Sequence, residues 1–221
     1  MTLQFCVLPS DHSRSSPPKQ LVVLIHGYGA SGQNLINVAH NFRDHYIPSA
    51  HFIAPNAPFP YEGGCDGYQW FSMQEHSEQY ILSGLNKAIP ILLQFIEEQL
   101  DKFNLTYHDL ALMGFSQGGM LALHTALQMS VPPKGVICYS GMLIASAIPV
   151  QANISNTKFI LVHGKEDQIV VVEAATETYE VLKSHNIDVA LHLEQWLGHG
   201  ISLDGIKVGG AFLSSLFKNK N

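Results

Sequence analysis

The segment 114–118, GFSQG, places a serine between two glycines where an apolar run is expected to change from strand to helix. A plain connection needs no hydroxyl at this point, whereas a serine held on a sharp strand-to-helix turn can act as a nucleophile. The G-x-S-x-G pattern alone is common by chance, and it gains weight only from this setting. We therefore predict that Ser116 attacks an acyl carbonyl; the alternative is an ordinary turn in which Ser116 caps the helix.

A serine hydroxyl needs a base to remove its proton, and the base needs an acid to orient it. With a serine turn of this kind, the expected order along the chain is serine, acid, histidine. Asp167 and His199 follow Ser116 in this order, each just after a predicted strand. We expect all three at one edge of a sheet, with Glu166 as the second choice for the acid.

Other histidines compete with His199 for the role of base. His192 lies within a predicted strand and is interpreted as structural, whereas His163 precedes Asp167 and is expected in the core or in a supporting role. A loop histidine satisfied by solvent is the alternative for His199 itself. The chain has twelve histidines but neither a pair at helical ligand spacing nor a C-x-x-C motif, so we expect no metal and no cofactor.

Acyl transfer also needs hydrogen-bond donors for the oxygen that becomes negative, usually two backbone N–H groups. We expect one donor at Gln117, directly after the nucleophile. The other is expected at Tyr28, in the glycine-rich loop 26–32, HGYGASG. A phosphate-binding loop is the rival interpretation, but this segment has neither G-x-G-x-x-G nor a Gly-Lys-Ser/Thr ending.

The stretch 55–72, PNAPFPYEGGCDGYQWFS, is long and rich in aromatic residues, glycine and proline. Loops of this length in a compact domain are usually lids or binding loops. We expect its aromatic side chains to line an acyl pocket, and the alternative is a surface loop pinned by its own rings. The predicted substrate-binding residues are Tyr61, Tyr68, Trp70 and Phe71.

Strand and helix patterns alternate along the chain, which predicts an α/β fold with a mostly parallel sheet covered by helices on both faces. An edge strand is expected at 3–9, and the long amphipathic segment 77–103 is expected to be kinked or split at Pro90. No linker or repeat divides the chain, so we expect a single domain over 1–221. Further strands are expected at 21–27, 51–55, 110–115, 135–141, 158–164 and 188–196, with helices at 34–46, 118–129, 172–185 and 204–218.

Composition excludes several classes of function. With 12 basic and 18 acidic residues, the net charge is −6, and no basic cluster suggests a nucleic-acid partner. No apolar run reaches the roughly 18 residues of a membrane span, and the N-terminus does not resemble a signal peptide. The cysteines Cys6, Cys65 and Cys138 are interpreted as free thiols in a reducing compartment, so we expect a cytoplasmic protein.

Six motifs in this order resemble the phospholipase/carboxylesterase family of α/β-hydrolases, which includes the acyl-protein thioesterases. The resemblance implies a triad of Ser116, Asp167 and His199, with oxyanion donors at Tyr28 and Gln117. It also implies a small, lidless or lightly covered ester or thioester hydrolase, often a homodimer. The motifs are HGYGASGQNL, PNAP, GYQWFS, GFSQGGMLALH, HGKEDQIV and GHGI.

The chain departs from the family pattern at two places. Tyr28 stands where many members have leucine, and its ring is expected to narrow the acyl groove. Tyr68-Gln69-Trp70 stands where eukaryotic thioesterases typically carry Arg-x-Trp.

The predicted function is therefore a serine carboxylesterase acting on short- to medium-chain esters, with lysophospholipids as further candidate substrates. The expected partner is a small ester or lipid, with at most transient contact with a membrane surface. The alternatives are an acyl-protein thioesterase and a non-catalytic binding protein on a hydrolase scaffold.

Overall fold

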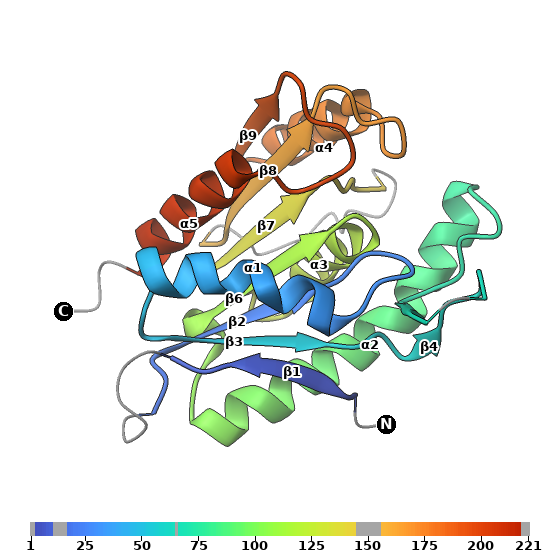
Figure 1. Ribbon diagram of the computed structural model, residues 1–221. Helices are drawn as coiled ribbons and strands as arrows, with labels where there is room; N and C mark the ends of the chain where they lie inside the picture. The colour runs from blue at the N-terminus through green and yellow to red at the C-terminus, as the bar shows by residue number, and fades with distance from the viewer. Residues whose placement is uncertain (1–2, 11–16, 65, 145–155, 218–221) are drawn as a thin grey trace.

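The computed structural model describes residues 3–10, 17–64, 66–144 and 156–217, and its centre is a seven-stranded sheet (Figure 1). The strand order is β1-β3-β2-β6-β7-β8-β9. The edge strand β1 pairs antiparallel with β3, and every other neighbouring pair is parallel. The strands are β1 (Phe5–Leu8), β2 (Gln20–Ile25), β3 (Ala50–Pro55), β6 (Leu110–Phe115), β7 (Gly135–Tyr139), β8 (Lys158–Gly164) and β9 (Asp188–Glu194).

Strands β2 and β3 are buried along their whole length because both faces of the sheet are covered. Every residue of β2 and of β3 is buried, as expected for continuous apolar runs in a parallel sheet. Pairing of Leu21 with Leu110, and of Ile25 with Gly114, brings β2 and β6 to the same end of the sheet. The predicted α/β class and the edge position of the first strand are both confirmed.

Five long helices among the described residues cover the two faces of the sheet (Figure 1). Helices α1 (Gly32–His45) and α5 (Leu203–Phe217) pack on one face. Helices α2 (Glu78–Phe103), α3 (Gln117–Gln128) and α4 (Val172–Ser184) pack on the other, and the short 3₁₀ helix η1 (Tyr107–Asp109) precedes β6. None of the described helices is both long enough and apolar enough to cross a bilayer.

Helix α2 runs without a break through Pro90, so the expected split does not occur. Proline removes one intrahelical hydrogen bond and crowds the preceding turn. Here Pro90 is on the exposed side, while an apolar stripe on the other side is buried against the sheet. Burial of that stripe offsets the local cost, and the helix continues. The stripe consists of Ile81, Leu85, Ala88, Ile89, Leu92, Phe95, Ile96 and Leu100.

The 55–72 segment contains a small hairpin that the sequence patterns did not predict. Strand β4 (Phe59–Pro60) pairs antiparallel with β5 (Tyr68–Gln69). Tyr68 also forms a bridge with Ala30, which joins the hairpin to the loop after β2. Among the cysteines, Cys6 and Cys138 are free thiols, whereas Cys65, like residues 11–16 of the first loop and residue 218 of the last predicted helix, lies outside the described residues.

Candidate active site

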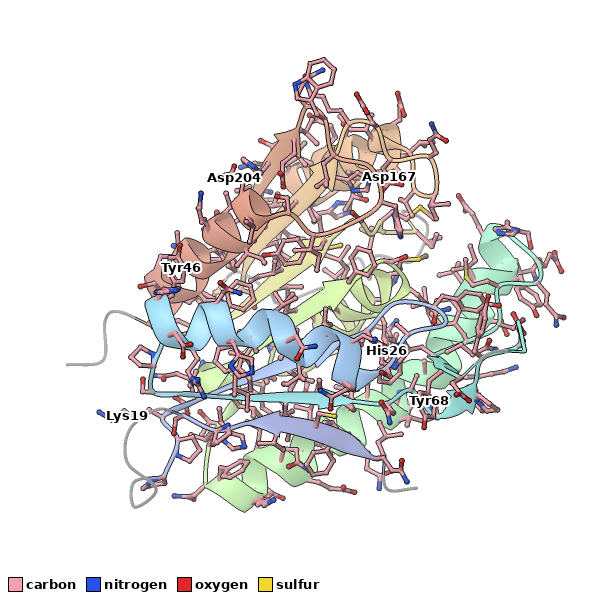
Figure 2. The ribbon with its side chains drawn as sticks, in the orientation of Figure 1. Lys19, His26, Tyr46, Tyr68, Asp167 and Asp204 are labelled. Atoms are coloured by element: carbon pink, nitrogen blue, oxygen red, sulfur yellow. The ribbon has the colours of Figure 1, made fainter. Side chains whose placement is uncertain are left out.

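Three of the predicted functional residues follow the carboxyl ends of parallel strands, which meet at one edge of the sheet. Ser116 follows β6, Asp167 follows β8 and His199 follows β9. Figure 2 shows Asp167 on the same side of the molecule as His26 and Tyr68, the side toward which the parallel strands point in Figure 1. This edge is where open α/β sheets bind ligands.

A continuous chain of hydrogen bonds joins the three side chains. His199 Nε2 lies 3.0 Å from Ser116 Oγ, and His199 Nδ1 lies 2.8 Å from Asp167 Oδ2. Since the ionised carboxylate can only accept, Nδ1 carries the proton and Nε2 is free to accept from the serine hydroxyl. The imidazole also packs on the Phe115 ring, with centroids 5.0 Å apart, which restricts its rotation.

The backbone at Ser116 is strained, as expected for a serine on a sharp strand-to-helix turn. Its φ of 54° and ψ of −119° lie in a region that non-glycine residues rarely adopt. The Ser116 N–H donates to Tyr139 O at 2.9 Å and so anchors the turn to β7. Gly118 permits the close approach of α3 to β2, because a Cβ there would lie 2.0 Å from Ile25 O.

The carboxylate of Asp167 is buried and fully engaged by the loop that follows β8. Its Oδ1 accepts from the N–H groups of Ile169 and Val170, both at 2.9 Å. Burial alone would raise its pKa, but the hydrogen bond with His199 and the two backbone N–H groups outweigh burial and lower the pKa below its ordinary value. Asp167 is therefore held as the anion that an imidazolium needs beside it.

The rival acid and histidines are placed differently. The Glu166 side chain is exposed, and His192 lies 3.7 Å from Asp204, on α5. His163 is buried, and its Nε2 lies 2.7 Å from Val170 O and 3.3 Å from Asp167 Oδ2. This arrangement agrees with the supporting role expected for His163.

The peptide group between Gly27 and Tyr28 is fixed by hydrogen bonds to its carbonyl oxygen. His26 Nε2 accepts from the Ala57 N–H, so the proton sits on Nδ1, which donates to Gly27 O at 2.8 Å. Burial lowers the pKa of His26 to about 4, although its bond to Gly27 opposes this, and the ring is neutral at pH 7. Ala30 N donates to the same oxygen at 3.2 Å. Because a trans peptide is planar, these bonds also fix the direction of the Tyr28 N–H.

Gln117 presents its backbone and its side chain to different partners. As the first residue of α3, it has a backbone N–H with no acceptor inside the helix. Its side chain is buried and joins α3 to the 55–72 segment. Gln117 Oε1 accepts from Trp70 N at 2.9 Å, and Nε2 donates to Phe71 O at 2.8 Å. The side chain thus positions the loop while the N–H faces outward from the helix start.

A cavity of about 390 Å³ opens at Ser116. It is mostly apolar, and the described residues that line it include no lysine, arginine, aspartate or glutamate. This lining suits an uncharged acyl chain rather than an acidic or basic group. The lining residues are Tyr28, Met73, His76, Ile81, Ser116, Gln117, Met120, Met142, Ile169, Val170, Val171 and Ala174.

The four aromatic residues expected to bind substrate are not among the described residues that line this cavity. Trp70 is fully buried, with its indole N–H donated to His26 O at 3.0 Å, and Phe71 is also buried. The Tyr61 ring meets the Tyr28 ring edge-on, and Tyr68 pairs with the loop after β2. Trp70 and Phe71 instead line a separate cavity of about 320 Å³, and Tyr68 lines a third one.

Comparison with known proteins identifies the family. The sequence profile of the phospholipase/carboxylesterase family matches residues 11–216, which is most of the chain. The chain belongs to the phospholipase/carboxylesterase family. It is therefore a serine hydrolase of the esterase and thioesterase class, as the sequence motifs predicted.

Individual members of the family resemble the chain along most of its length. Esterase YpfH from Escherichia coli is 27% identical over 86% of this chain and 79% of the relative. Acyl-protein thioesterase 1 from Emericella nidulans is 29% identical over 85% of each chain. The crystal structure of esterase PE8 superposes with a TM-score of 0.87 at 34% identity, covering 98% of this chain and 100% of that one.

Several lining residues of this family member were not predicted from the sequence. Met73, His76 and Met142 lie in irregular segments, and Ile81 and Met120 lie on apolar helix faces that periodicity assigns to the core. No local pattern distinguishes a core methionine from one that lines a cavity. Among the described residues there is no group of three histidine, cysteine, aspartate or glutamate side chains placed to hold a metal ion.

Proposed function

We propose that this member of the family is a carboxylesterase that hydrolyses short- to medium-chain esters through Ser116, His199 and Asp167, within a single α/β-hydrolase domain over 1–221. The observation that carries the proposal is the unbroken hydrogen-bond chain from Ser116 Oγ through the imidazole to the buried carboxylate. Each group in this chain has the partner that its chemical role requires.

In the proposed reaction, Ser116 Oγ forms a bond to the acyl carbon while its proton moves to His199 Nε2. Collapse of the tetrahedral intermediate breaks the bond to the leaving alcohol, which takes that proton. Water then attacks the acyl-enzyme, gives a proton to the same nitrogen and releases the acid as Ser116 is protonated again. Asp167 stabilises the imidazolium at both stages without taking its proton.

The proposed oxyanion donors are the backbone N–H groups of Tyr28 and Gln117. The loop that carries Tyr28 lies against the serine turn, because a Cβ on Gly27 would be only 3.3 Å from Ser116 Cβ. The Gln117 N–H belongs to the first turn of α3, where the helix dipole also favours negative charge. Both donors are held before substrate arrives, which is what stabilisation of a developing charge requires.

The cavity supports neutral esters as substrates, since the described residues of its lining carry no charged group for a headgroup. The family includes proteins named as esterases and as acyl-protein thioesterases, so thioesters are the second candidate class. Tyr28 and the Tyr68-Gln69-Trp70 segment, in place of leucine and Arg-x-Trp, favour the simple ester. Lysophospholipids are further candidates, because the acyl chain rather than the headgroup would occupy the cavity.

A substrate panel tests the proposal. We expect turnover of p-nitrophenyl butyrate and octanoate that exceeds turnover of an S-palmitoylated peptide and of lysophosphatidylcholine, and no turnover by Ser116→Ala. Preference for the palmitoylated peptide would establish the thioesterase instead. A wild type that hydrolyses no substrate and does not react with an organophosphonate probe would establish a binding protein on a hydrolase scaffold.

We also propose a cytoplasmic location and transient contact with lipid surfaces. The free thiols of Cys6 and Cys138 support a reducing compartment.

Four large apolar side chains near the loops of Asp167 and His199 are exposed, which supports contact with an amphiphilic surface. Co-sedimentation with phosphatidylcholine vesicles tests this contact, and sedimentation velocity tests the homodimer that the family suggests. The four are Ile169, Val171, Trp196 and Leu203.

A further inference from the structure

Glu62 is not among the described residues that line the cavity, yet it accepts hydrogen bonds from two residues that do. Its carboxylate accepts from the Tyr28 hydroxyl, from the Ser72 hydroxyl at 2.9 Å and from the Met73 N–H at 3.0 Å. Gln69 Nε2 donates to it at 3.2 Å, and the Glu62 N–H donates to Gln69 Oε1 at 2.9 Å. An exposed glutamate with this many fixed neutral donors is unusual, because solvent normally satisfies such a carboxylate.

The partners of Glu62 include two residues that line the cavity at Ser116. Tyr28 comes from the loop after β2, and Met73 comes from the far end of the 55–73 segment. Both bond to the same oxygen, Oε1, so a single atom joins these two lining residues and fixes the spacing between them. Their relative position shapes the part of the cavity that they line.

The negative charge on Glu62 strengthens the hydrogen bonds that its carboxylate accepts. The hydrogen bond from Tyr28 is the main cause that lowers the pKa of Glu62 to about 2; desolvation opposes it, and the bonds from Met73, Gln69 and Ser72 lower the pKa further. The carboxylate is thus ionised at neutral pH, and hydrogen bonds to an ionised acceptor are roughly twice as strong as neutral ones.

The Tyr28 ring is restrained at both ends. Its backbone segment is joined to the hairpin, since Gly29 N donates to Tyr68 O at 3.0 Å and Tyr68 N donates to Ala30 O at 2.8 Å. Its ring meets the Tyr61 ring edge-on, with centroids 4.9 Å apart. The hydroxyl contact with Glu62 is a second restraint on the ring, so its loss leaves the ring held by Tyr61 alone while the backbone bonds of the loop remain.

We propose that Glu62 is a positioning residue that holds Tyr28 and Met73 at a fixed spacing and thereby sets the acyl-chain length that the site accepts. Glu62 is not part of the described cavity lining, so it acts through Tyr28 and Met73. This inference rests on the proposed esterase function and adds a determinant of its selectivity.

The test compares kcat/KM for p-nitrophenyl octanoate with that for p-nitrophenyl butyrate, with active enzyme counted by organophosphonate titration. Glu62→Ala removes every contact of the carboxylate, whereas Tyr28→Phe removes one hydroxyl and leaves the ring and the backbone N–H in place. Asp66→Asn, on the same hairpin loop and exposed, is the matched control for loss of an acidic charge.

In Glu62→Ala and in Tyr28→Phe we expect the octanoate-to-butyrate ratio to rise by about 10-fold, the effect of roughly one methylene in a pocket. Glu62→Gln should give a smaller change, since its amide oxygen can still accept from Tyr28. Asp66→Asn should not change the ratio. The double variant Glu62→Ala/Tyr28→Phe should show no more change than Glu62→Ala alone, because both substitutions break the contact between Tyr28 and Glu62.

A loop that is merely less stable would lower both rates by the same factor and leave the ratio unchanged. An unchanged ratio in both Glu62→Ala and Tyr28→Phe would therefore overturn the inference while the esterase function stands. If Glu62→Ala does not fold, Tyr28→Phe decides alone. A wild type without ester turnover would overturn the proposed function and this inference together.

Discussion

His163 and Asp167 are in direct contact inside the molecule, with Nε2 of the imidazole 3.3 Å from Oδ2 of the carboxylate. This is the same oxygen that His199 contacts at 2.8 Å. His163 also lies 2.7 Å from Val170 O and so holds the loop whose N–H groups bind the other carboxylate oxygen. The orientation of the acid therefore depends on a residue that never reaches the cavity.

Replacement of His163 by asparagine should lower kcat on a short ester by about 10-fold to 100-fold, because a small displacement of Asp167 misaligns His199. Loss of the buried hydrogen bond should also reduce the free energy of unfolding by about 1–3 kcal/mol. Steady-state kinetics and urea unfolding measure the two effects. His192→Asn, on the adjacent strand and outside the site, is the control, and a stability loss without a change in kcat would show that His163 only packs.

Replacement of Asp167 by asparagine should lower kcat by roughly 10³- to 10⁴-fold, because an amide can hold His199 in the wrong tautomer and cannot stabilise the imidazolium. The bonds from Ile169 N and Val170 N to the side-chain oxygen can remain, so the fold should persist. Glu166→Gln removes a charge from the neighbouring exposed position and should leave kcat unchanged. Equal losses in the two variants would contradict the assignment of the acid.

Glycine at position 118 is required by packing, which a substitution can test. A Cβ there would lie 2.0 Å from Ile25 O and 2.6 Å from His26 O, so Gly118→Ala must push α3 away from β2. We expect a loss of about 3 kcal/mol or more in the free energy of unfolding, together with slower organophosphonate labelling of Ser116.

Gly200→Ala is the matched control for this substitution. It lies beside His199 and would meet no atom within 4 Å, so the free energy of unfolding should change by less than about 0.5 kcal/mol. A Gly118→Ala protein as stable as Gly200→Ala would show that the approach of α3 to β2 does not demand glycine.

The placement of Ser116, Asp167 and His199 was predictable because each follows a strand that its own apolar run defines. In a parallel sheet the carboxyl ends of such strands meet at one edge, whatever the lengths of the connections between them. Strand recognition was therefore enough to bring together residues as far apart as 116 and 199. The strain at Ser116 was predictable for the same reason, since it arises from the sharp turn between two recognisable elements.

The walls of the cavity were not predictable in this way. The 55–73 segment has no periodicity, and its side chains are oriented by the β4–β5 hairpin and by bonds such as that from Trp70 to His26 O. These contacts turn Trp70 into the core, although an aromatic residue in a loop suggests a binding surface. Glu62 sits in a glycine-rich stretch, and its contact with Tyr28, 34 residues earlier in the chain, forms only in the folded structure.

Helix α3 carries a titratable group that should make stability depend on pH. His124 is buried, burial lowers its pKa to about 4, and its Nε2 accepts from the Ile144 N–H at 3.1 Å. In the unfolded chain a histidine has a pKa of about 6.5, so unfolding takes up a proton between about pH 4 and 6.5. The stability contributed by the neutral ring is complete above this window and is lost as the pH falls through it.

We expect the titration of His124 to make the free energy of unfolding about 2 kcal/mol lower at pH 5 than at pH 7.5. The amide oxygen of His124→Gln can accept from the same N–H but does not titrate. The variant should therefore lose about 2 kcal/mol less than the wild type between these pH values, as measured by urea unfolding. Some dependence should remain, because His26 titrates in the same sense. His108→Gln, at an exposed position, should lose as much stability as the wild type, and an equal loss in His124→Gln would show that His124 does not cause the dependence.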